Sequence, residues 1–231
     1  MFCTIKVKLE YLIPLFCLSL AAVSVLIFGG DKGLEVASVQ RDNYLIIDPG
    51  HGGIDGGALS VSGDKESDIN LDIAKKLSLI ATLYGENVLL TRENDLARTD
   101  AKSYSEREDL MHRTEIVNSV PNAVLISIHQ NCYPTSQPSG AQVLYANNDL
   151  SRQFGEISHE NIIHFLQPEN RRVAEPAPKK LYITSNAKCP TILVECGFMS
   201  NLSDLTKLKD AVYQTALSSV LFASYLQFRY P

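Results

Sequence analysis

The chain has 231 residues, with 21 basic and 26 acidic side chains and a formal net charge of −5. The lysines and arginines form no long run, so nucleic acid is not an expected partner. Beyond an apolar N-terminal segment, about 190 residues remain, a length that suits one domain with a single hydrophobic core.

The N-terminal segment has the features of an export signal. Residues 11–30 contain no charged side chain, and Lys6 and Lys8 precede them. This is about the length that a helix needs to cross a bilayer, and the preceding positive charge predicts a cytoplasmic N-terminus. A cleaved signal peptide is the alternative, although its apolar region usually spans only about 7–15 residues. We expect residues 1–30 to be a signal anchor or signal peptide that places the rest of the chain outside the cytoplasmic membrane, and residues 31–42 to be a linker.

Short apolar runs of strand length follow along the remainder of the chain. They are rich in branched side chains and are bounded by turn residues. The expected strands are residues 44–48, 87–91, 123–128, 141–145 and 191–195. Runs that are apolar almost throughout indicate a sheet covered on both faces.

Helical patterns lie between these runs. Ile69, Ile73, Leu77 and Ile80 recur at spacings of three and four, which marks one face of a helix, and Gly85 suits the position just beyond its end. Further helices are expected at residues 105–118, 150–166 and 203–228, whereas residues 167–180 hold three prolines and are expected to form a surface loop. The alternation of strands and helices predicts an α/β fold with a largely parallel sheet.

Chemically capable residues stand where three of the expected strands end. His51 follows the first strand, His129 follows the third, and Glu195 ends the fifth. Functional side chains gather at the carboxyl ends of strands in such sheets, so we expect these three to lie close together. Glu66 opens the first helix, and the glycine-rich loop of residues 50–63 connects it directly to His51.

Two imidazoles and one carboxylate from separate elements are the ligand set of a catalytic zinc, which keeps a fourth position for water. The sequence therefore predicts a Zn²⁺ site formed by His51, Glu66 and His129. Zinc lowers the pKa of its water to about 7. Glu195 is then expected to accept the proton of that water and to return it to a leaving amine.

Other readings of these residues are weaker. The glycine loop matches neither GxxxxGK[ST] nor GxGxxG, so a phosphate loop is not expected. His159, Glu160 and His164 form HExxxH rather than HExxH, and at about 100° per residue the two histidines lie on different sides of a helix, so we expect surface residues. His112 is also expected on a helix surface.

The cysteines leave two alternatives open. Cys132 lies three residues after His129 and is the alternative nucleophile, of a cysteine hydrolase. Cys132, Cys189 and Cys196 show no CxxC spacing, and we expect three small buried thiols, with one disulfide as the alternative.

Four segments together resemble a known family. They are DPGHGG at residues 48–53, ESDINL at 66–71, SIHQN at 127–131 and VECGFMSN at 194–201. In this order and spacing they resemble the signature segments of the zinc-dependent N-acetylmuramoyl-L-alanine amidases of amidase type 3. LTRENDL at residues 90–96 and the part of HRTEIVN from Arg113 to Asn118 resemble the family pattern as well. Gln130 and Cys132 depart from it, because the family often has small residues there.

The resemblance implies an amidase catalytic domain at residues 43–231, with a mixed, mainly parallel sheet flanked by helices. It places the zinc ligands on His51, Glu66 and His129 and the catalytic glutamate on Glu195. The implied substrate is the peptidoglycan glycan strand with its stem peptide, cleaved between N-acetylmuramic acid and L-alanine.

The short chain with an N-terminal membrane segment is most similar to the spore-cortex and germination branch of the family. That similarity implies a role in cortex maturation, in which removal of the peptide leads to muramic δ-lactam. Relatives are often controlled by partner proteins, so an activating protein partner is a further expectation. A binding module without catalysis is the main rival, but such a module would be expected to lack some of the four site residues, and all four are present.

Overall fold

The computed structural model describes residues 42–95 and 104–231. The targeting segment expected at residues 1–30 lies outside these residues, as does nearly all of the expected linker. Within the described residues, no helix has the length and apolar character that a membrane crossing requires.

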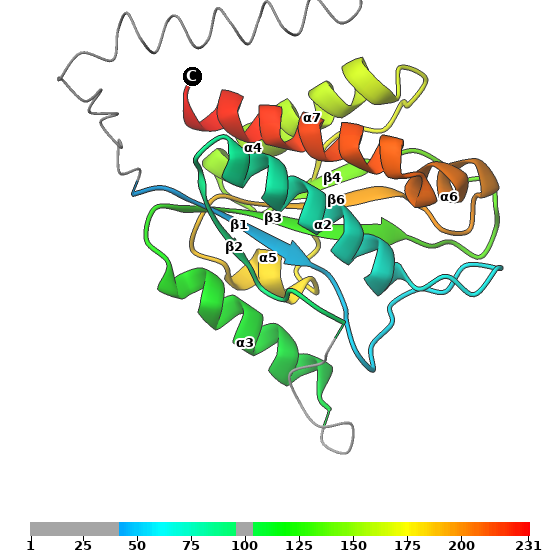
Figure 1. Cartoon of the computed structure of the whole chain (residues 1–231), viewed down its shortest axis with the longest axis horizontal. Helices are drawn as coiled ribbons and strands as arrows, with labels where there is room; N and C mark the ends of the chain where they lie inside the picture. Colours follow the sequence, from blue (N-terminus) through cyan, green and yellow to red (C-terminus); the bar gives the residue numbers. More distant parts are fainter. Residues whose placement is uncertain (1–41, 96–103) are drawn as a thin grey trace, which may run out of the picture. The chain divides into compact units, whose positions relative to one another are not determined.

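A six-stranded sheet in the order β2-β1-β3-β6-β4-β5 forms the centre of the fold (Figure 1). Its strands are β1 (Tyr44–Pro49), β2 (Asn87–Leu90), β3 (Ala123–Asn131), β4 (Gln142–Tyr145), β5 (Glu175–Pro176) and β6 (Thr191–Phe198). The first four strands of this order run parallel, β4 is antiparallel to β6, and β5 is parallel to β4. The mixed, mainly parallel sheet implied by the sequence is confirmed.

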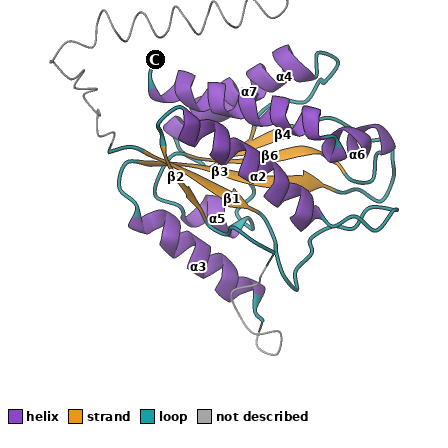
Figure 2. Ribbon diagram, in the orientation of Figure 1, coloured by secondary structure: helices purple, strands orange, loops and turns teal. Residues whose placement is uncertain are grey.

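Helices cover both faces of the sheet, as expected (Figure 2). They are α2 (Glu66–Leu83), α3 (Glu106–Ser119), α4 (Asp149–Leu166), α5 (Tyr182–Asn186), α6 (Leu202–Lys209) and α7 (Ala211–Arg229). On one face α7 packs between α2 and α4, and on the opposite face α3 packs against α5. α6 contacts β6 and α7.

The alternation of side chains along the strands divides the core between the two faces. Leu77 of α2, Phe154 of α4 and Tyr225 of α7 are completely buried in the larger core, against residues such as Ile126 and Val194. Each buried side chain of this size contributes about 1.5–3 kcal/mol.

The smaller core lies under α3 and α5. Val117 and Ile183 pack there against Ile46 and Leu125 of the sheet. It covers only part of this face, and the functional side chains described below lie on the same face.

Two strands are longer than expected. β3 continues past Ile128 to Asn131, and β6 continues past Glu195 to Phe198, so that His129 and Glu195 lie within strands rather than at their ends. The reason is that backbone pairing goes on after the apolar side chains stop. His129 pairs with Glu195 in register, and Asn131 pairs with Phe198 after a register shift.

The helix expected at residues 203–228 is wrong as a single element. It is divided into α6 and α7, and the break falls at Asp210, which has an extended backbone. The Asp210 side chain caps α7, because its Oδ1 accepts a hydrogen bond from the backbone N–H of Tyr213 at 2.7 Å. The expected loop at residues 167–180 also contains the two-residue strand β5, and α5 was not anticipated.

This cap gives a stability prediction. Asp210→Ala should lower the free energy of unfolding by about 1 kcal/mol, the usual effect of removing an N-cap side chain. Urea denaturation of the purified protein measures this difference. Glu156→Ala, an exposed position within α4, is the matched control and should change stability by less than about 0.5 kcal/mol. Equal stability of the two variants would contradict the capping role.

Candidate active site

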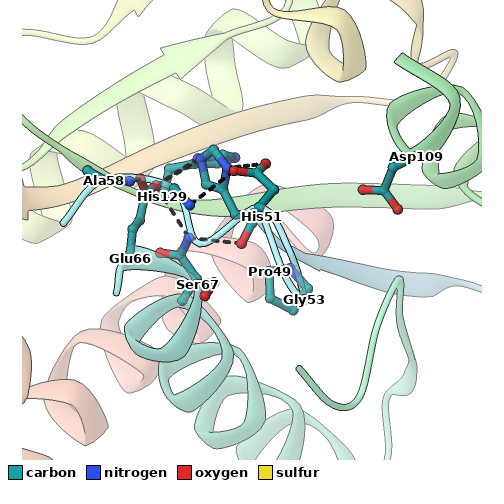
Figure 3. Close-up of polar contacts among 12 residues, drawn as sticks. Pro49, His51, Gly53, Ala58, Glu66, Ser67, Asp109 and His129 are labelled. Carbon is teal, nitrogen blue, oxygen red and sulfur yellow. Dashed lines mark hydrogen bonds and ion pairs between the residues drawn. The ribbon is translucent and has the colours of Figure 1, made fainter. Parts of the chain in front are cut away.

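The structure brings the three predicted metal ligands together. One ligand atom from each of His51, Glu66 and His129 can be chosen so that all lie within 4.8 Å of one another. Glu66 Oε1 lies 3.0 Å from His129 Nδ1 and 3.4 Å from His51 Nε2. The two imidazole rings meet edge to face, with centroids 5.0 Å apart (Figure 3).

The glycine loop allows this close approach. His51 has φ 61°, in the left-handed region, immediately after β1. A Cβ on Gly50 would lie 2.2 Å from the ring of His129, and a Cβ on Gly57 would lie 2.6 Å from Glu66 Oε2. Side chains at these two positions would collide with the ligands, so the glycines are a packing requirement of the site.

Glu66 is the most enclosed of the three. It begins α2, and its side chain is only 5% exposed. Its Oε2 accepts a hydrogen bond from the backbone N–H of Ala58, and its Oε1 accepts one from the backbone N–H of Gln130. Burial by itself would raise the pKa of Glu66, but hydrogen bonds and charge from His129 and His51 hold it well below its usual range. The carboxylate is therefore ionised.

His51 has a second carboxylate behind it. Its Nδ1 lies 2.7 Å from Asp55 Oδ2, while its Nε2 faces Glu66. Burial opposes charge on the ring, yet the hydrogen bonds to Asp55 and Glu66 raise the pKa of His51 to about 10. The two carboxylates thus favour positive charge between them. A carboxylate on the far nitrogen is also how metal-binding histidines are commonly oriented.

These residues fit a divalent metal ion. Two imidazole nitrogens and one ionised carboxylate are the donors of a catalytic zinc site. Tetrahedral ligands at about 2.0–2.1 Å from zinc lie roughly 3.3 Å from one another. The separations of 3.0 and 3.4 Å between Glu66 Oε1 and the two histidines agree with that spacing, and all three ligand atoms lie within 4.8 Å of one another.

Glu195 faces the same site. It pairs in register with His129, so the two side chains lie on the same face of neighbouring strands. Both line a cavity of about 270 Å³ together with His51 and Glu66. Within the described residues, Glu195 Oε2 is buried without a hydrogen-bond partner. Burial raises the pKa of Glu195, the charge of His129 opposes that effect, and the charge of Glu66 reinforces it. A glutamate with a raised pKa is suited to exchange protons near neutral pH.

Two arginines that sequence reasoning did not assign hold the loop of His51. Arg113 donates hydrogen bonds to the carbonyl oxygens of Pro49 and His51, at 2.7 and 2.6 Å, and to the buried carboxylate of Asp48 at 3.1 Å. Arg92 donates to the carbonyls of Pro49 and Gly50 at 2.9 and 3.0 Å. Both arginines fall in segments that resemble the family pattern, which was the only signal for them.

Asp55 was also missed. It lies four residues after His51 in the same loop, and a histidine followed by a nearby carboxylate is a signal that could have identified it. Gln130, the departure from the family pattern, is buried, and its side-chain amide donates a hydrogen bond to Asn70 Oδ1 at 3.0 Å.

The remaining histidines and cysteines lie apart from this cavity. His164 is exposed as expected, but the expectation for His159 is wrong, because His159 is buried and its Nε2 lies 2.8 Å from the carbonyl oxygen of Arg172. The prediction of three buried thiols holds for Cys196, whereas Cys132 is exposed and Cys189 is half-buried. All three of these thiols are free, and none lines the cavity.

An α/β fold that brings two histidines and two glutamates into one cavity fits the class of hydrolases with a site suited to a metal ion. The family model described as N-acetylmuramoyl-L-alanine amidase, amidase type 3, matches residues 45–223. The chain therefore belongs to this family, and it is a cell-wall amidase of peptidoglycan that acts outside the cytoplasm.

Similar proteins agree with this assignment. The germination-specific N-acetylmuramoyl-L-alanine amidase of Bacillus subtilis is 34% identical over 197 residues, which cover 80% of this chain and 78% of the relative. The CwlD amidase of Clostridioides difficile, solved in complex with the GerS lipoprotein, is 30% identical with a TM-score of 0.76, over 81% of this chain and 98% of that one. AmiC2 of Nostoc punctiforme is 27% identical with a TM-score of 0.71, over 82% and 98%.

The buried ion pair behind the site gives a second prediction. Arg113→Ala leaves Asp48 buried without its counter-charge, and removing one partner of such a pair destabilises a protein by about 3–5 kcal/mol. Chemical denaturation followed by circular dichroism measures the change. Arg107→Ala, an exposed arginine in the same helix, is the control and should be nearly neutral. A change below about 1 kcal/mol for Arg113→Ala would contradict the structural role of the pair.

Proposed function

We propose that the chain is a zinc-dependent amidase that hydrolyses the amide between the lactyl group of N-acetylmuramic acid and the L-alanine of the stem peptide. The observation that carries the proposal is the convergence of His51, Glu66 and His129 opposite Glu195 in one cavity. Family membership supports the reaction and the donor set supports the metal.

The three ligands would hold the ion, each from a different element. His51 comes from the loop after β1, Glu66 from the start of α2, and His129 from β3. When bound, zinc polarises the scissile carbonyl and lowers the pKa of water to about 7. Asp55 keeps the Nε2 atom of His51 directed at the site, because it occupies Nδ1.

Glu195 performs the proton transfers. Its Oε2, which has no hydrogen-bond partner in the described part of the chain, accepts a proton from the attacking water while the water oxygen adds to the carbonyl carbon. The carboxylic acid then gives this proton to the nitrogen of L-alanine as the carbon–nitrogen bond breaks. The second proton of the water also passes to this nitrogen, so the products are the muramic carboxylate and the protonated amine of the stem peptide, and Glu195 returns to its ionised form.

We also place the chain in spore-cortex maturation, where removal of stem peptides precedes muramic δ-lactam formation. The germination-specific relative and the fold likeness to CwlD support this role. Because CwlD was solved with a lipoprotein, a protein partner is part of the proposal. The charge pattern around residues 11–30 supports export, with membrane anchoring if that segment is retained.

Glu195→Gln tests the catalytic role. The rate of stem-peptide release from peptidoglycan should fall about 10²–10⁴-fold, the usual contribution of a positioned acid–base group. Mass spectrometry measures the released peptide, and elemental analysis should find unchanged zinc content. Glu160→Gln, an exposed glutamate of the HExxxH segment, is the matched control and should retain full activity. Full activity of Glu195→Gln would contradict the assignment.

Metal removal separates the zinc enzyme from a cysteine hydrolase. A chelator should abolish peptide release and added Zn²⁺ should restore it, because the polarised carbonyl and the activated water both depend on the ion. Alkylation of the exposed thiol of Cys132 should leave the rate unchanged. Loss of activity on alkylation, together with resistance to the chelator, would contradict the zinc mechanism and support a cysteine hydrolase.

A further inference from the structure

We propose that Arg172, held in place by Gln142, binds a carboxylate of the stem peptide on the side of Glu195 away from the metal ligands. Arg172 would thus select substrates whose residue next to L-alanine carries a free carboxylate. This inference rests on the proposed amidase reaction and adds a specificity-determining residue to it.

A row of paired side chains crosses the sheet at the level of Glu195. Glu195 of β6 pairs in register with His129 of β3 on one side and with Gln142 of β4 on the other. Directly paired residues project from the same face of a sheet. Gln142 is therefore the neighbour of Glu195 on the side opposite the metal ligands.

Arg172 continues this row beyond Gln142. Its Nη1 donates a hydrogen bond to Gln142 Oε1 at 3.1 Å, and its Nε donates to the carbonyl oxygen of Ser139 at 3.1 Å. The guanidinium also lies over the ring of Phe198, 4.6 Å from the ring centroid. Three contacts with different segments orient the group before any ligand arrives.

The charge of Arg172 is left without a counter-ion. Among the described residues no carboxylate lies within 4.0 Å of its guanidinium, and its Nη2 has no hydrogen-bond partner there. Arg113 and Arg171, by contrast, each have a carboxylate within that distance. A fixed, planar and only half-buried guanidinium whose Nη2 donors are free among the described residues matches a carboxylate, which it can bind through charge-assisted hydrogen bonds.

The substrate offers such a group only on its peptide side. The N-acetylated sugars of the glycan are neutral, whereas the stem peptide carries free carboxylates. The catalytic cavity is also lined by α3 and the residues before it, where Tyr104 and Glu106 contribute an aromatic ring and an acidic group and Asp109 is neutralised by Arg113, a surface that suits sugar hydroxyls better than an anion. The distribution of charge therefore directs the peptide toward Arg172.

The distances agree with this orientation. Neighbouring strands lie about 4.8 Å apart, so Gln142 lies one spacing from Glu195, and the guanidinium lies beyond Gln142 at the end of a side-chain hydrogen bond of 3.1 Å. The scissile nitrogen must come within about 3 Å of Glu195, and two extended residues span about 7 Å. The carboxylate of the residue after L-alanine can thus reach Arg172. A separate cavity of about 580 Å³, lined by Arg171, Arg172 and Lys207 among others, offers room for the rest of the stem peptide.

Lys180 is a second cation that a carboxylate of the substrate could meet. It lines the catalytic cavity but is exposed, and within the described part of the chain no hydrogen bond orients its ammonium. A flexible ammonium of this kind discriminates poorly between a carboxylate and an amide compared with an oriented guanidinium. Lys180 therefore serves as the matched control.

The experiment compares the rates at which the zinc-loaded, full-length protein cleaves two substrates. The substrates are glycan fragments that differ only in the residue after L-alanine, which carries either a free carboxylate or the corresponding primary amide. The wild type should cleave the carboxylate form with a kcat/KM about tenfold higher, the effect of one charge-assisted contact at a half-exposed site. In Arg172→Gln this ratio should fall to about one, whereas Lys180→Gln should retain it. Arg172→Lys should show an intermediate ratio, since it keeps the charge but loses the planar donors.

The ratio between two substrates does not depend on how much of a variant is folded, because misfolded protein lowers both rates equally. Equal cleavage of both fragments by the wild type would overturn the inference while leaving the amidase function intact. So would an unchanged preference in Arg172→Gln, or loss of the preference in Lys180→Gln. Failure to cleave either fragment would instead overturn the proposed function itself.

Discussion

The geometry of the site depends on the hydrogen bonds that the buried carboxylate of Asp48 accepts. Thr91, Ser127 and Arg113 all donate hydrogen bonds to this carboxylate, at 2.6, 2.7 and 3.1 Å. It therefore connects β1 with the residue after β2, with the middle of β3 and with the helix α3. Burial alone would raise the pKa of Asp48, but Arg113 and the two hydroxyls lower it, and the group remains ionised. Arg113, fixed by this charge, then holds the carbonyl of His51. A strained left-handed backbone at His51 persists because these contacts over-determine it.

Along β3 and β6, side chains that pack in the hydrophobic core alternate with side chains of the candidate active site. Ile128 and Val194 point into the larger core and are fully buried, while their neighbours His129 and Glu195 project from the opposite face. The same two strands therefore anchor the core and carry a ligand and the proposed base. Extension of β3 and β6 beyond these residues keeps them inside a paired ladder, where backbone hydrogen bonds limit their movement. A site on rigid strands holds its geometry better than one on loop tips.

Much of this arrangement could be predicted from the sequence, because it follows from local patterns. Apolar runs and helical spacing located every strand of the described sheet except β5, and most helices. The position of His51, His129 and Glu195 near strand ends indicated one edge of the sheet. The contacts of Arg92 and Arg113 could not be predicted in this way. Arg113 bonds to His51 across 62 residues, and nothing in its own helix indicates a buried partner. The burial of His159 depends likewise on the path of a distant loop segment. Strand ends were missed because side-chain pattern does not record backbone pairing.

The glycine loop and the row of Gln142 and Arg172 make different contributions to the proposed site: the loop allows the metal ligands to approach one another, and the row provides polar groups for the substrate. At Gly50 and Gly57 the absence of side chains lets His129 and Glu66 approach the loop closely, which brings the proposed metal ligands together. Beyond Glu195, in contrast, side chains are long, polar and fixed by their neighbours. A ligand set alone can hydrolyse many amides, since a metal ion recognises only the carbonyl and the water. Discrimination must therefore come from groups that contact the substrate away from the scissile bond. The guanidinium of Arg172, which has no counter-ion among the described residues and is held by the Gln142 that pairs with Glu195, is placed for that purpose.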